Sequence, residues 1–218
     1  MARARQTSPT ETDSDIDTAT AILDIAERLV QRRGFNGFSY ADIAAELGIT
    51  KASLHYHFPG KAELGESLMT RYASRFAEAL AEIDARVVPA ADKLRAYCGI
   101  YRAVLSEHRM CLCGMLAAEY ETLPDPMRHA VVAFLDHNQE WLSALLEGGR
   151  AARSLRFFDT ADQAARSIVA ALEGAMLVSR PYGDTAVLDS VADHLVAEFS
   201  VRARPAGPSK SRAVSSGT

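Results

Sequence analysis

The chain has 218 residues, of which 48% are hydrophobic, and a formal net charge of −4. This length and apolar content fit one large helical domain, or a small domain followed by a larger one, with a sizeable core. The acidic balance argues against a histone-like, non-specific DNA binder, whose affinity comes from neutralising phosphates, but it allows a sequence-specific binder with a locally basic face. The candidates for such a face are Arg28, Arg32, Arg33, Lys51 and Lys61.

Cysteine usage and hydropathy bear on the location of the protein. There are three cysteines, an odd number, and the N-terminus lacks the apolar segment of a signal peptide. No apolar run is long enough to span a bilayer. We therefore expect a cytoplasmic protein with reduced thiols and no membrane contact.

The N-terminal region predicts an arm followed by a helix. Residues 1–17 are polar and are expected to form a disordered arm. Residues 18–33 repeat apolar side chains at helical spacing, and Gly34 follows as an end signal. Phe35 and Phe38 are expected to pack beneath the elements that come next.

Residues 39–61 predict two short helices joined by a tight turn. Ser39 precedes Asp42 by three residues, which is the pattern of a capping box. Gly48 ends the first helix, because glycine enters the left-handed conformation without a Cβ clash. Thr50 is the N-cap of the second helix, which stops ahead of a Pro-Gly pair. Two short helices around such a turn form a helix-turn-helix.

The second of these helices has an unusual outer face. Leu54 and Phe58 are four residues apart and point inward. The other positions carry small, hydrogen-bonding or cationic side chains, which suit a helix in a DNA major groove. An ordinary surface helix is the alternative, but it would be rich in Glu, Lys and Gln. The predicted DNA contacts, from this helix and its flanks, are Ser39, Thr50, Lys51, Ala52, Ser53, His55, Tyr56, His57 and Lys61.

The remaining chain predicts six more helices and no convincing strand, so the fold class is all-α with about nine helices. The additional helices are expected at residues 60–86, 92–109, 111–120, 126–147, 160–178 and 184–199. The expected organisation is a disordered arm (1–17), a helix-turn-helix domain (18–60), a larger helical domain for effector binding and dimerisation (61–202) and a disordered tail (203–218).

The helix-turn-helix segment resembles the DNA-binding signature of TetR-type transcriptional repressors. The resemblance covers roughly residues 18–70 at motif level, and the rest of the chain only in length and helical character. It rests on residues 39–44, 47–54, 57–58 and Lys61; His55 stands where the family often has Tyr. The resemblance implies a homodimeric regulator that binds a double-stranded DNA operator and leaves it when a small-molecule effector binds.

The same resemblance implies that the last two helices form the dimer interface, although they also fit a plain core. The expected interface residues are Ile168, Ala171, Leu172, Ala175, Val187, Val191 and Leu195. Two recognition helices related by a two-fold axis would read a palindrome. The middle helices would enclose a mostly apolar effector pocket, and their aromatic and polar residues are also consistent with plain core. Its candidate lining residues are Tyr97, Cys98, Tyr101, Leu105, His108, Cys111, Met115, Tyr120, Phe134, His137 and Trp141.

Cys111 raises a second hypothesis. His108 and Arg109 precede it at a predicted helix start, and nearby cations and a helix N-terminus favour the reactive thiolate. Cys111, or its neighbour Cys113, is therefore a candidate sensor of electrophiles or oxidants; two small buried residues are the alternative. A metal site is not predicted, since His108 and Cys111 alone do not make a zinc site, and no cofactor is implied.

An enzyme is the rival class. The chain has no phosphate-binding glycine loop, nucleophile elbow or paired hydrolytic motif. A helical adaptor for a protein partner is a further alternative. Binding to duplex DNA discriminates both from a regulator. We predict a DNA-binding regulator without enzymatic activity.

Overall fold

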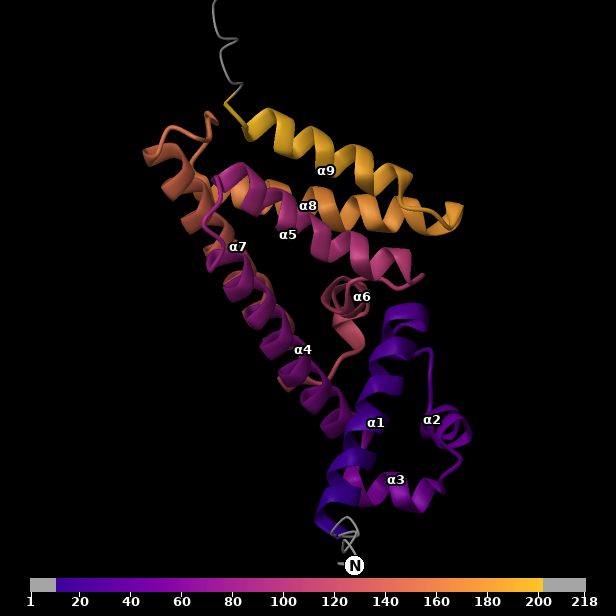
Figure 1. Ribbon diagram of the computed structural model, residues 1–218. Coiled ribbons are helices and arrows are strands. Elements are labelled where there is room, and N and C mark those ends of the chain that lie inside the picture. Colours follow the sequence, from indigo (N-terminus) through magenta and orange to yellow (C-terminus); the bar gives the residue numbers. More distant parts are fainter. Residues whose placement is uncertain (1–10, 202–218) are drawn as a thin grey trace, which may run out of the picture.

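The protein was analysed as a computed structural model, which describes residues 11–201, with side chains from Asp17 onward. The described chain forms nine α-helices and two short 3-10 turns (Figure 1). In chain order these are α1 (Glu11–Arg33), α2 (Tyr40–Leu47), α3 (Lys51–His57), α4 (Lys61–Asp84), α5 (Ala90–Ser106), α6 (Leu112–Ala118), η1 (Tyr120–Thr122), α7 (Asp125–Ala151), α8 (Ala161–Ser179), η2 (Arg180–Tyr182) and α9 (Ala186–Phe199).

The helices form two regions joined by α4 (Figure 1). Helices α1, α2 and α3 make one end of the molecule, which we call the reading head. Helices α5, α8 and α9 lie together at the other end, and α7 runs beside α4 and packs on α8. The short helix α6 lies between the two regions and contacts both α1 and α7. The all-α prediction is confirmed: the only β pairing among residues 11–201 is an isolated bridge between Leu155 and Ser200.

The N-terminal boundary differs from the prediction. Helix α1 begins at Glu11, so residues 11–17 extend the helix instead of forming part of an arm. The rest of the expected arm, residues 1–10, and the expected tail, residues 203–218, lie outside the described chain.

The predicted end of the helix at residue 147 is also wrong. Helix α7 continues through Gly148 and Gly149 to Ala151. A Cβ on Gly149 would lie 2.5 Å from a methyl carbon of Leu155 and 2.9 Å from Cβ of Ala90. This glycine therefore allows close packing inside a helix that was expected to end two residues earlier.

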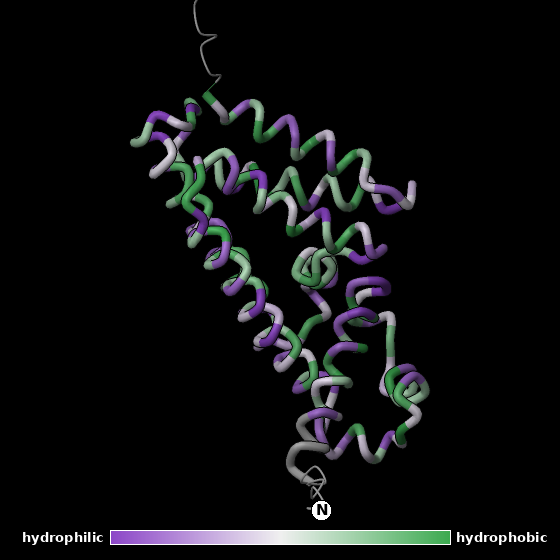
Figure 2. Tube along the Cα trace, viewed as in Figure 1, coloured by the Kyte–Doolittle hydropathy of each residue, from purple (hydrophilic) through white to green (hydrophobic). Residues whose placement is uncertain are grey.

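The buried side chains form one continuous cluster that runs through both regions. Figure 2 shows the apolar stripes of the helices turned toward one another. The reading head joins this core at Gly65 of α4, where an added Cβ would lie 2.4 Å from Sδ of Met127 and 3.0 Å from the ring of Phe35. No helix within residues 11–201 is both long and apolar enough to cross a membrane.

Candidate nucleic-acid interface and effector site

The turn between α2 and α3 has the predicted geometry. Ser39 and Asp42 form a capping box, in which the backbone N–H of Ser39 donates to Oδ2 of Asp42 at 2.7 Å. The hydrogen bonds from the Ser39 hydroxyl and backbone lower the pKa of Asp42. Gly48 ends α2 with φ of 68°, and the Thr50 hydroxyl accepts from the backbone N–H of Ser53 at 3.1 Å. These caps fix the angle between the two helices.

The inner side of α3 is anchored to the reading head. Leu54 and Phe58 are buried, as predicted. The hydroxyl of Tyr40, at the start of α2, lies 2.9 Å from the carbonyl oxygen of Phe58 and 2.6 Å from that of Gly60, and donates to them. Burial, followed by the charge of Glu63, raises the pKa of Tyr40 to about 12, so this donor keeps its proton at neutral pH.

The outer side of α3 is open to solvent. Ala52 and Tyr56 are four residues apart and lie opposite Leu54, because helical residues advance about 100° each. The Tyr56 side chain is 73% exposed and meets the ring of His57 edge to face at 5.1 Å between centroids. A large exposed aromatic residue beside a small residue gives α3 both contact area and room for a base pair.

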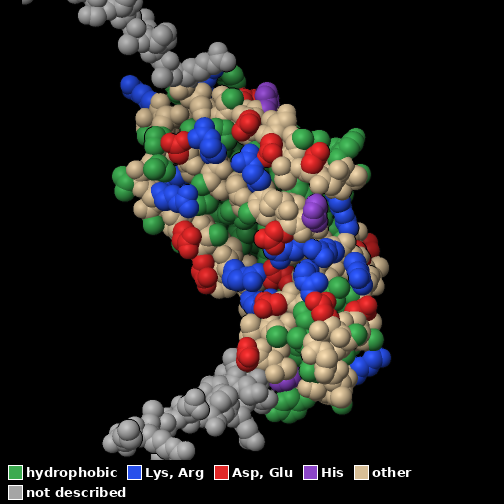
Figure 3. All heavy atoms as spheres, turned by 45° about the vertical axis from the view of Figure 1, so that its right-hand side comes forward, with side chains coloured by type: hydrophobic (Ala, Val, Ile, Leu, Met, Phe, Trp, Pro, Cys, Tyr) green, Lys and Arg blue, Asp and Glu red, His purple; other side chains and the backbone are tan. Residues whose placement is uncertain are grey.

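The basic residues near this surface are mostly engaged within the chain. Arg28 pairs with Glu46, and Arg33 lies 3.6 Å from Asp42. The ammonium group of Lys61 donates to the carbonyl of Phe38 at 2.5 Å and lies over two Phe rings. Lys51, by contrast, is exposed at the start of α3. Figure 3 shows Lys and Arg gathering in a band across the middle of the molecule, interspersed with acidic residues, rather than over the tip of the reading head.

His55 is turned toward α2. Its ring packs against that of Tyr40 at 4.8 Å between centroids, with the two planes tilted by 49°, and Nδ1 donates to the carbonyl of Pro59 at 3.0 Å. A carbonyl oxygen can only accept, so Nδ1 is the donor of this hydrogen bond. This contact commits one side of His55 to the reading head.

A buried polar cluster lies in the region beyond the reading head, where five helices meet. The Tyr97 hydroxyl donates to Oδ1 of Asn138 at 2.7 Å, and Nδ2 of Asn138 donates to the Tyr101 hydroxyl at 3.2 Å. The two tyrosine hydroxyls are 3.0 Å apart. All three residues are at most 3% exposed. Polar groups at this depth stay stable only when they are paired, so the triangle is a fixed feature of the core.

Next to this triangle, Cys111 contacts Glu173 of α8. The Cys111 thiol hydrogen-bonds to the Glu173 carboxylate, and Sγ lies 3.8 Å from the Tyr72 hydroxyl. Burial first, and then the Glu173 charge, raises the pKa of Cys111 well above its ordinary value. This overturns our electrostatic argument for a thiolate: the charged neighbour is an acid from a distant helix, while the Arg109 guanidinium bonds to Glu107 and Gln31.

The structure brings together only part of the predicted effector set. Tyr97, Tyr101, Cys111 and Phe134 converge on the cluster, where the Phe134 ring packs 5.6 Å from that of Tyr72. Cys98 and Leu105 are buried along α5, and Met115 and Tyr120 are partly exposed near the reading head. His108 and His137 are exposed, and neither takes part in the cluster.

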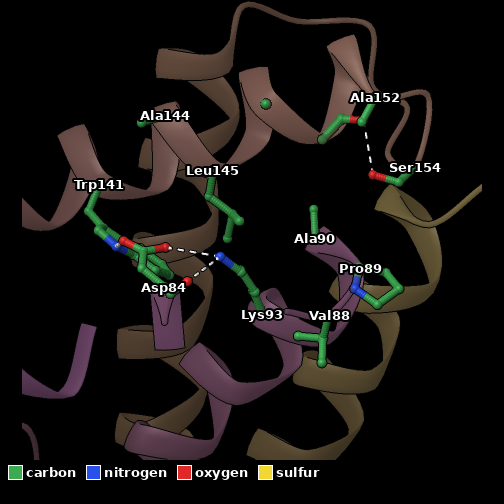
Figure 4. Close-up of a pocket in the computed structure, with 12 residues that line it drawn as sticks. Asp84, Val88, Pro89, Ala90, Lys93, Trp141, Ala144, Leu145, Ala152 and Ser154 are labelled. Carbon is green, nitrogen blue, oxygen red and sulfur yellow. Dashed lines mark hydrogen bonds and ion pairs between the residues drawn. The ribbon is translucent and has the colours of Figure 1, made fainter. Parts of the chain in front are cut away.

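Trp141 connects the cluster to the surface. Its ring stacks on Tyr97 at 5.6 Å, and its indole N–H donates to Oδ2 of Asp84 at 2.7 Å. Figure 4 shows Trp141, Asp84 and Lys93 along one side of a surface pocket of 580 Å³ formed by the ends of α4, α5 and α7. The Lys93 ammonium donates to the Asp84 carbonyl at 2.9 Å. The indole is therefore a wall shared by the pocket and the buried tyrosines.

Helix α6 links the cluster to the reading head. Its first residues hold Cys111 against Glu173, while Glu119, directly after its end, accepts from the backbone N–H of Phe35 at 2.5 Å and of Asn36 at 3.3 Å. The side-chain amide of Asn36 also donates, through Nδ2, to the Thr122 hydroxyl at 2.7 Å. We call this set of contacts the Glu119 latch. It ties the loop after α1 directly to the segment that borders the cluster.

Sequence reasoning missed Glu119, Asn138 and Glu173. Asn138 and Glu173 did carry a signal, because each is a polar residue on the apolar face of a helix: Asn138 lies four residues from both Phe134 and Leu142, and Glu173 directly follows the buried Leu172. Glu119 carried none, since its partners are backbone amides 84 and 83 residues away.

The predicted dimer residues are mostly inside the chain. Ile168, Leu172 and Ala175 of α8 are at most 4% exposed and Leu195 is 8% exposed, so these four side chains face the core of this chain, and their part in a dimer stays a prediction. Helix α8 packs on α7 and α9, and an apolar stripe serves such a core as well as a partner. On α8 the exposed glycine and aliphatic residues are Ala170, Gly174, Leu177 and Val178, while Ala171 and, on α9, Val187 and Val191 are partly buried. Leu177 and Val178 are 61% and 52% exposed.

A metal centre has no support in the described residues, which contain no group of three or more His, Cys, Asp or Glu side chains placed to hold an ion. The two histidines of α3 point to separate partners, Pro59 and Tyr56.

Comparison with known families matches the two regions separately. Residues 22–68 match the model described as bacterial regulatory proteins, tetR family, and residues 90–195 match the model described as tetracyclin repressor-like, C-terminal domain. The transcriptional regulator AcuR of Cereibacter sphaeroides is 28% identical over 66% of this chain and 68% of its own. The regulator LmrA of Bacillus subtilis is 28% identical over 75% of this chain and 86% of its own.

Solved structures agree along nearly the whole described chain. A TetR-family regulator from Agrobacterium tumefaciens superposes with a TM-score of 0.83 at 33% identity, covering 86% of this chain and all of the other. The reduced form of NemR from E. coli gives a TM-score of 0.75 at 26% identity, covering 84% of this chain and 97% of the other.

Proposed function

Because this chain belongs to the TetR family of bacterial regulatory proteins, we propose that it binds a palindromic operator as a homodimer and is released when a small molecule enters its buried polar cluster. It is a DNA-binding transcriptional regulator of the repressor type, and its relatives are regulators rather than enzymes.

The observation that carries the DNA-binding proposal is the outer face of α3. Tyr56 and Ala52 lie at its centre, and Ser53 and His57 are partly exposed to one side. We assign base contacts to this face and phosphate contacts to Lys51 and the Thr50 flank, since phosphate contacts position a protein and base contacts specify the sequence. Lys61 and Ser39 are already engaged within the head, so their part in phosphate binding is secondary.

The test is titration of a labelled duplex from upstream of the gene, with Tyr56→Ala and Lys51→Ala as variants. Loss of Tyr56 should abolish specific binding, because its ring lies at the centre of the face to which we assign base contacts. The reading head should stay folded, because the Tyr56 side chain is largely exposed. Loss of Lys51 should weaken all sequences alike and reduce the salt slope by about 1. Phe158→Ala, which removes another exposed aromatic ring far along the chain, is the control. Unchanged specific affinity in Tyr56→Ala would contradict this assignment.

Dimerisation follows from the shortness of α3, since one helix of seven residues reaches few base pairs. We propose that the outward face of α8 around Leu177, together with the outward side of α9, forms the two-fold contact. Exposed apolar side chains beside small residues suit close helix packing. The domain organisation we propose keeps residues 18–60 as the reading head and residues 61–202 as the effector and dimer region.

Release is proposed to act through α6. A ligand that enters the cluster must displace side chains around Cys111 and Tyr97, and α6 carries that movement to the Glu119 latch. A ligand shifts the equilibrium only if it binds one geometry better than the other. The reading heads would then leave the spacing that fits the operator.

A second switch is favoured by one observation. Cys111 is hydrogen-bonded to a carboxylate, and an adjacent base activates a nucleophile. Thiol modification at Cys111 would push α6 in the same way as a bound ligand. Cys113 has less support, because within the described residues its thiol is influenced by the charges of Cys111 and Glu173 without a hydrogen bond to either.

A further inference from the structure

A pocket of 220 Å³ lies where the reading head meets the rest of the chain, over the last turn of α1. One wall carries His108 and Arg109, which follow α5, and the other carries Ser179 and Arg180, at the end of α8 and in η2. In Figure 1 this end of α1 lies beside α6 and away from α3. The pocket is therefore separate from the proposed DNA surface, and it shares no residue with the tyrosine triangle or with the pocket beside Trp141.

Both walls of this pocket are bonded to α1. From the first wall, the backbone N–H of Met110 donates to the Gln31 carbonyl at 3.1 Å, and Nη1 of Arg109 donates to Oε1 of Gln31 at 3.1 Å. From the second wall, Nη2 of Arg180 donates to the carbonyl of Arg32. Carbonyls in the last turn of a helix lack partners within the helix and attract cations. The pocket thus lies between two walls that each hold the reading head.

The two guanidinium groups of the pocket keep unused donors. A guanidinium has five N–H donors, and a thioether sulfur is a weak acceptor. Besides the Arg32 carbonyl, Arg180 contacts Sδ of Met115 at 3.4 Å, and no acid within the described residues pairs with it. Nε of Arg109 is buried and has no partner in the described part of the chain. A buried donor without an acceptor is destabilising, so this arrangement indicates an acceptor that binds here.

The neighbouring groups add donors rather than acceptors. His108 has φ of 56°, at a helix end where glycine is usual, so an imidazole is kept there despite backbone strain. The buried Ser179 hydroxyl accepts from a backbone N–H of α9 at 3.1 Å, and its own O–H has no acceptor among residues 11–201. The carboxylate in the lining, that of Asp184, accepts from the backbone N–H two residues later, and the nearby Glu107 pairs with Arg109.

We propose that this pocket binds a compact organic oxyanion, a phosphate or carboxylate group on a short carbon chain, between Arg109 and Arg180. The planar guanidinium fork matches the oxygens of both groups. Leu105 and Met110 are buried in the lining and offer an apolar surface for the carbon chain. Sites for drug-sized ligands occupy about 300–1,000 Å³, so a pocket of 220 Å³ excludes nucleotides and other large anions.

The position of the site gives the bound anion a consequence for the reading head. An anion held by both guanidinium groups would bridge two walls that are each bonded to the last turn of α1. It would stabilise α1 in its present orientation, since binding stabilises the state that binds. The chain would then have a second input, apart from the buried polar cluster, that acts on the orientation of the reading head.

The test is calorimetric titration of the full-length protein without DNA, in phosphate-free buffer at constant ionic strength. The probes are glycerol 3-phosphate and succinate, and glycerol is the uncharged control. At least one probe should bind saturably and glycerol should not. Binding of glycerol 3-phosphate alone would identify the phosphate source, and binding of succinate alone the carboxylate source. Hydrogen exchange at the Met110 amide should slow with the bound probe, because its bond to Gln31 is stabilised.

Matched variants assign the binding to this pocket. Arg180→Gln should weaken it by about tenfold or more, and Arg180→Lys should recover part, since it keeps the charge but loses the fork. Asp184→Asn removes the opposing charge but keeps an acceptor oxygen for the backbone, so it should tighten binding by about threefold. Arg86→Gln, which removes an exposed arginine after the end of α4, should bind like the wild type.

Two results would overturn the proposal: no saturable binding of either probe, or wild-type affinity in both Arg180→Gln and Asp184→Asn. Melting of each variant without ligand detects damage to the fold. Should Arg180→Gln fail to fold, the tighter binding expected of Asp184→Asn still decides, because a loss of structure does not increase affinity. The experiment contains no operator, so its outcome is independent of the proposed DNA binding.

Discussion

At the residue scale, several side chains act through hydrogen bonds that depend on protonation. The capping box of α2 is one of them, because Asp42 must be ionised to accept from Ser39. Its pKa is lowered in the folded protein, first by the Ser39 side chain and then by the Ser39 backbone. A lowered folded-state pKa gives stability that is present above the unfolded value and is lost as the pH falls through the folded one.

We therefore expect Asp42→Asn to destabilise the protein at pH 7, where the unfolded carboxyl, of ordinary pKa 3.8, is also ionised. The gap between the wild type and the variant should close as the pH falls below about 4. Urea unfolding of both proteins at pH 7, 5 and 3 measures this. A difference in unfolding free energy that stays constant across that range would mean that ionisation of Asp42 contributes nothing to stability.

Gly114 allows a second prediction at this scale. In most helix interiors Gly→Ala stabilises by up to about 1 kcal/mol. At Gly114 the new methyl group would meet the Glu173 carboxylate at 2.3 Å, so Gly114→Ala should instead destabilise by about 1–3 kcal/mol. Gly99→Ala in α5, which meets nothing within 4 Å, is the matched control and should be neutral or stabilising. Calorimetric melting compares the two, and equal effects would contradict the close contact.

At the scale of elements, local patterns predicted the caps and most helix boundaries, because Ser39, Gly48 and Thr50 act on neighbours a few residues away. Contacts between distant helices were not predictable in the same way. Leu172 and Ala175 have the spacing of a dimer stripe and of a core stripe alike, and only the packing of α7 and α9 against α8 distinguishes them. The prediction that nearby cations favour the Cys111 thiolate was wrong for the same reason, since Glu173 comes from another helix.

The Glu119 latch gives a prediction for α6. Glu119→Ala removes the acceptor of the Phe35 and Asn36 amides, so these amides should lose hydrogen-exchange protection. Operator affinity should fall by about tenfold, because the lost hydrogen bonds contribute roughly 1–3 kcal/mol to holding the reading head in its orientation. Glu121→Ala, an exposed neighbour within η1, is the control. Normal protection of both amides in Glu119→Ala would show that the loop is held by other contacts.

At the scale of the whole molecule, the proposed function requires two chains. Leu177→Arg on the outward face of α8 should shift the dimer toward monomer and weaken operator binding, because a charge would have to be buried between copies. Phe158→Arg, fully exposed elsewhere, should remain dimeric. Sedimentation over a range of concentrations measures both. A dimeric Leu177→Arg protein would place the interface on another face.

The continuity of the core also matters for engineering and for evolution by recombination. From its order along the sequence the chain looks modular, with a reading head followed by an effector and dimer region that could each be exchanged. Two contacts cross the boundary between the two regions. One is the packing of Gly65 against Met127 and Phe35, and the other is the hydrogen bond from the loop after α1 to Glu119. A hybrid regulator that exchanges only residues 18–60 would keep its operator preference but lose the contacts that we propose to couple the effector site to the reading head. A working hybrid should therefore receive the segment from Arg109 to Thr122 together with the reading head, so that the two contact surfaces still match.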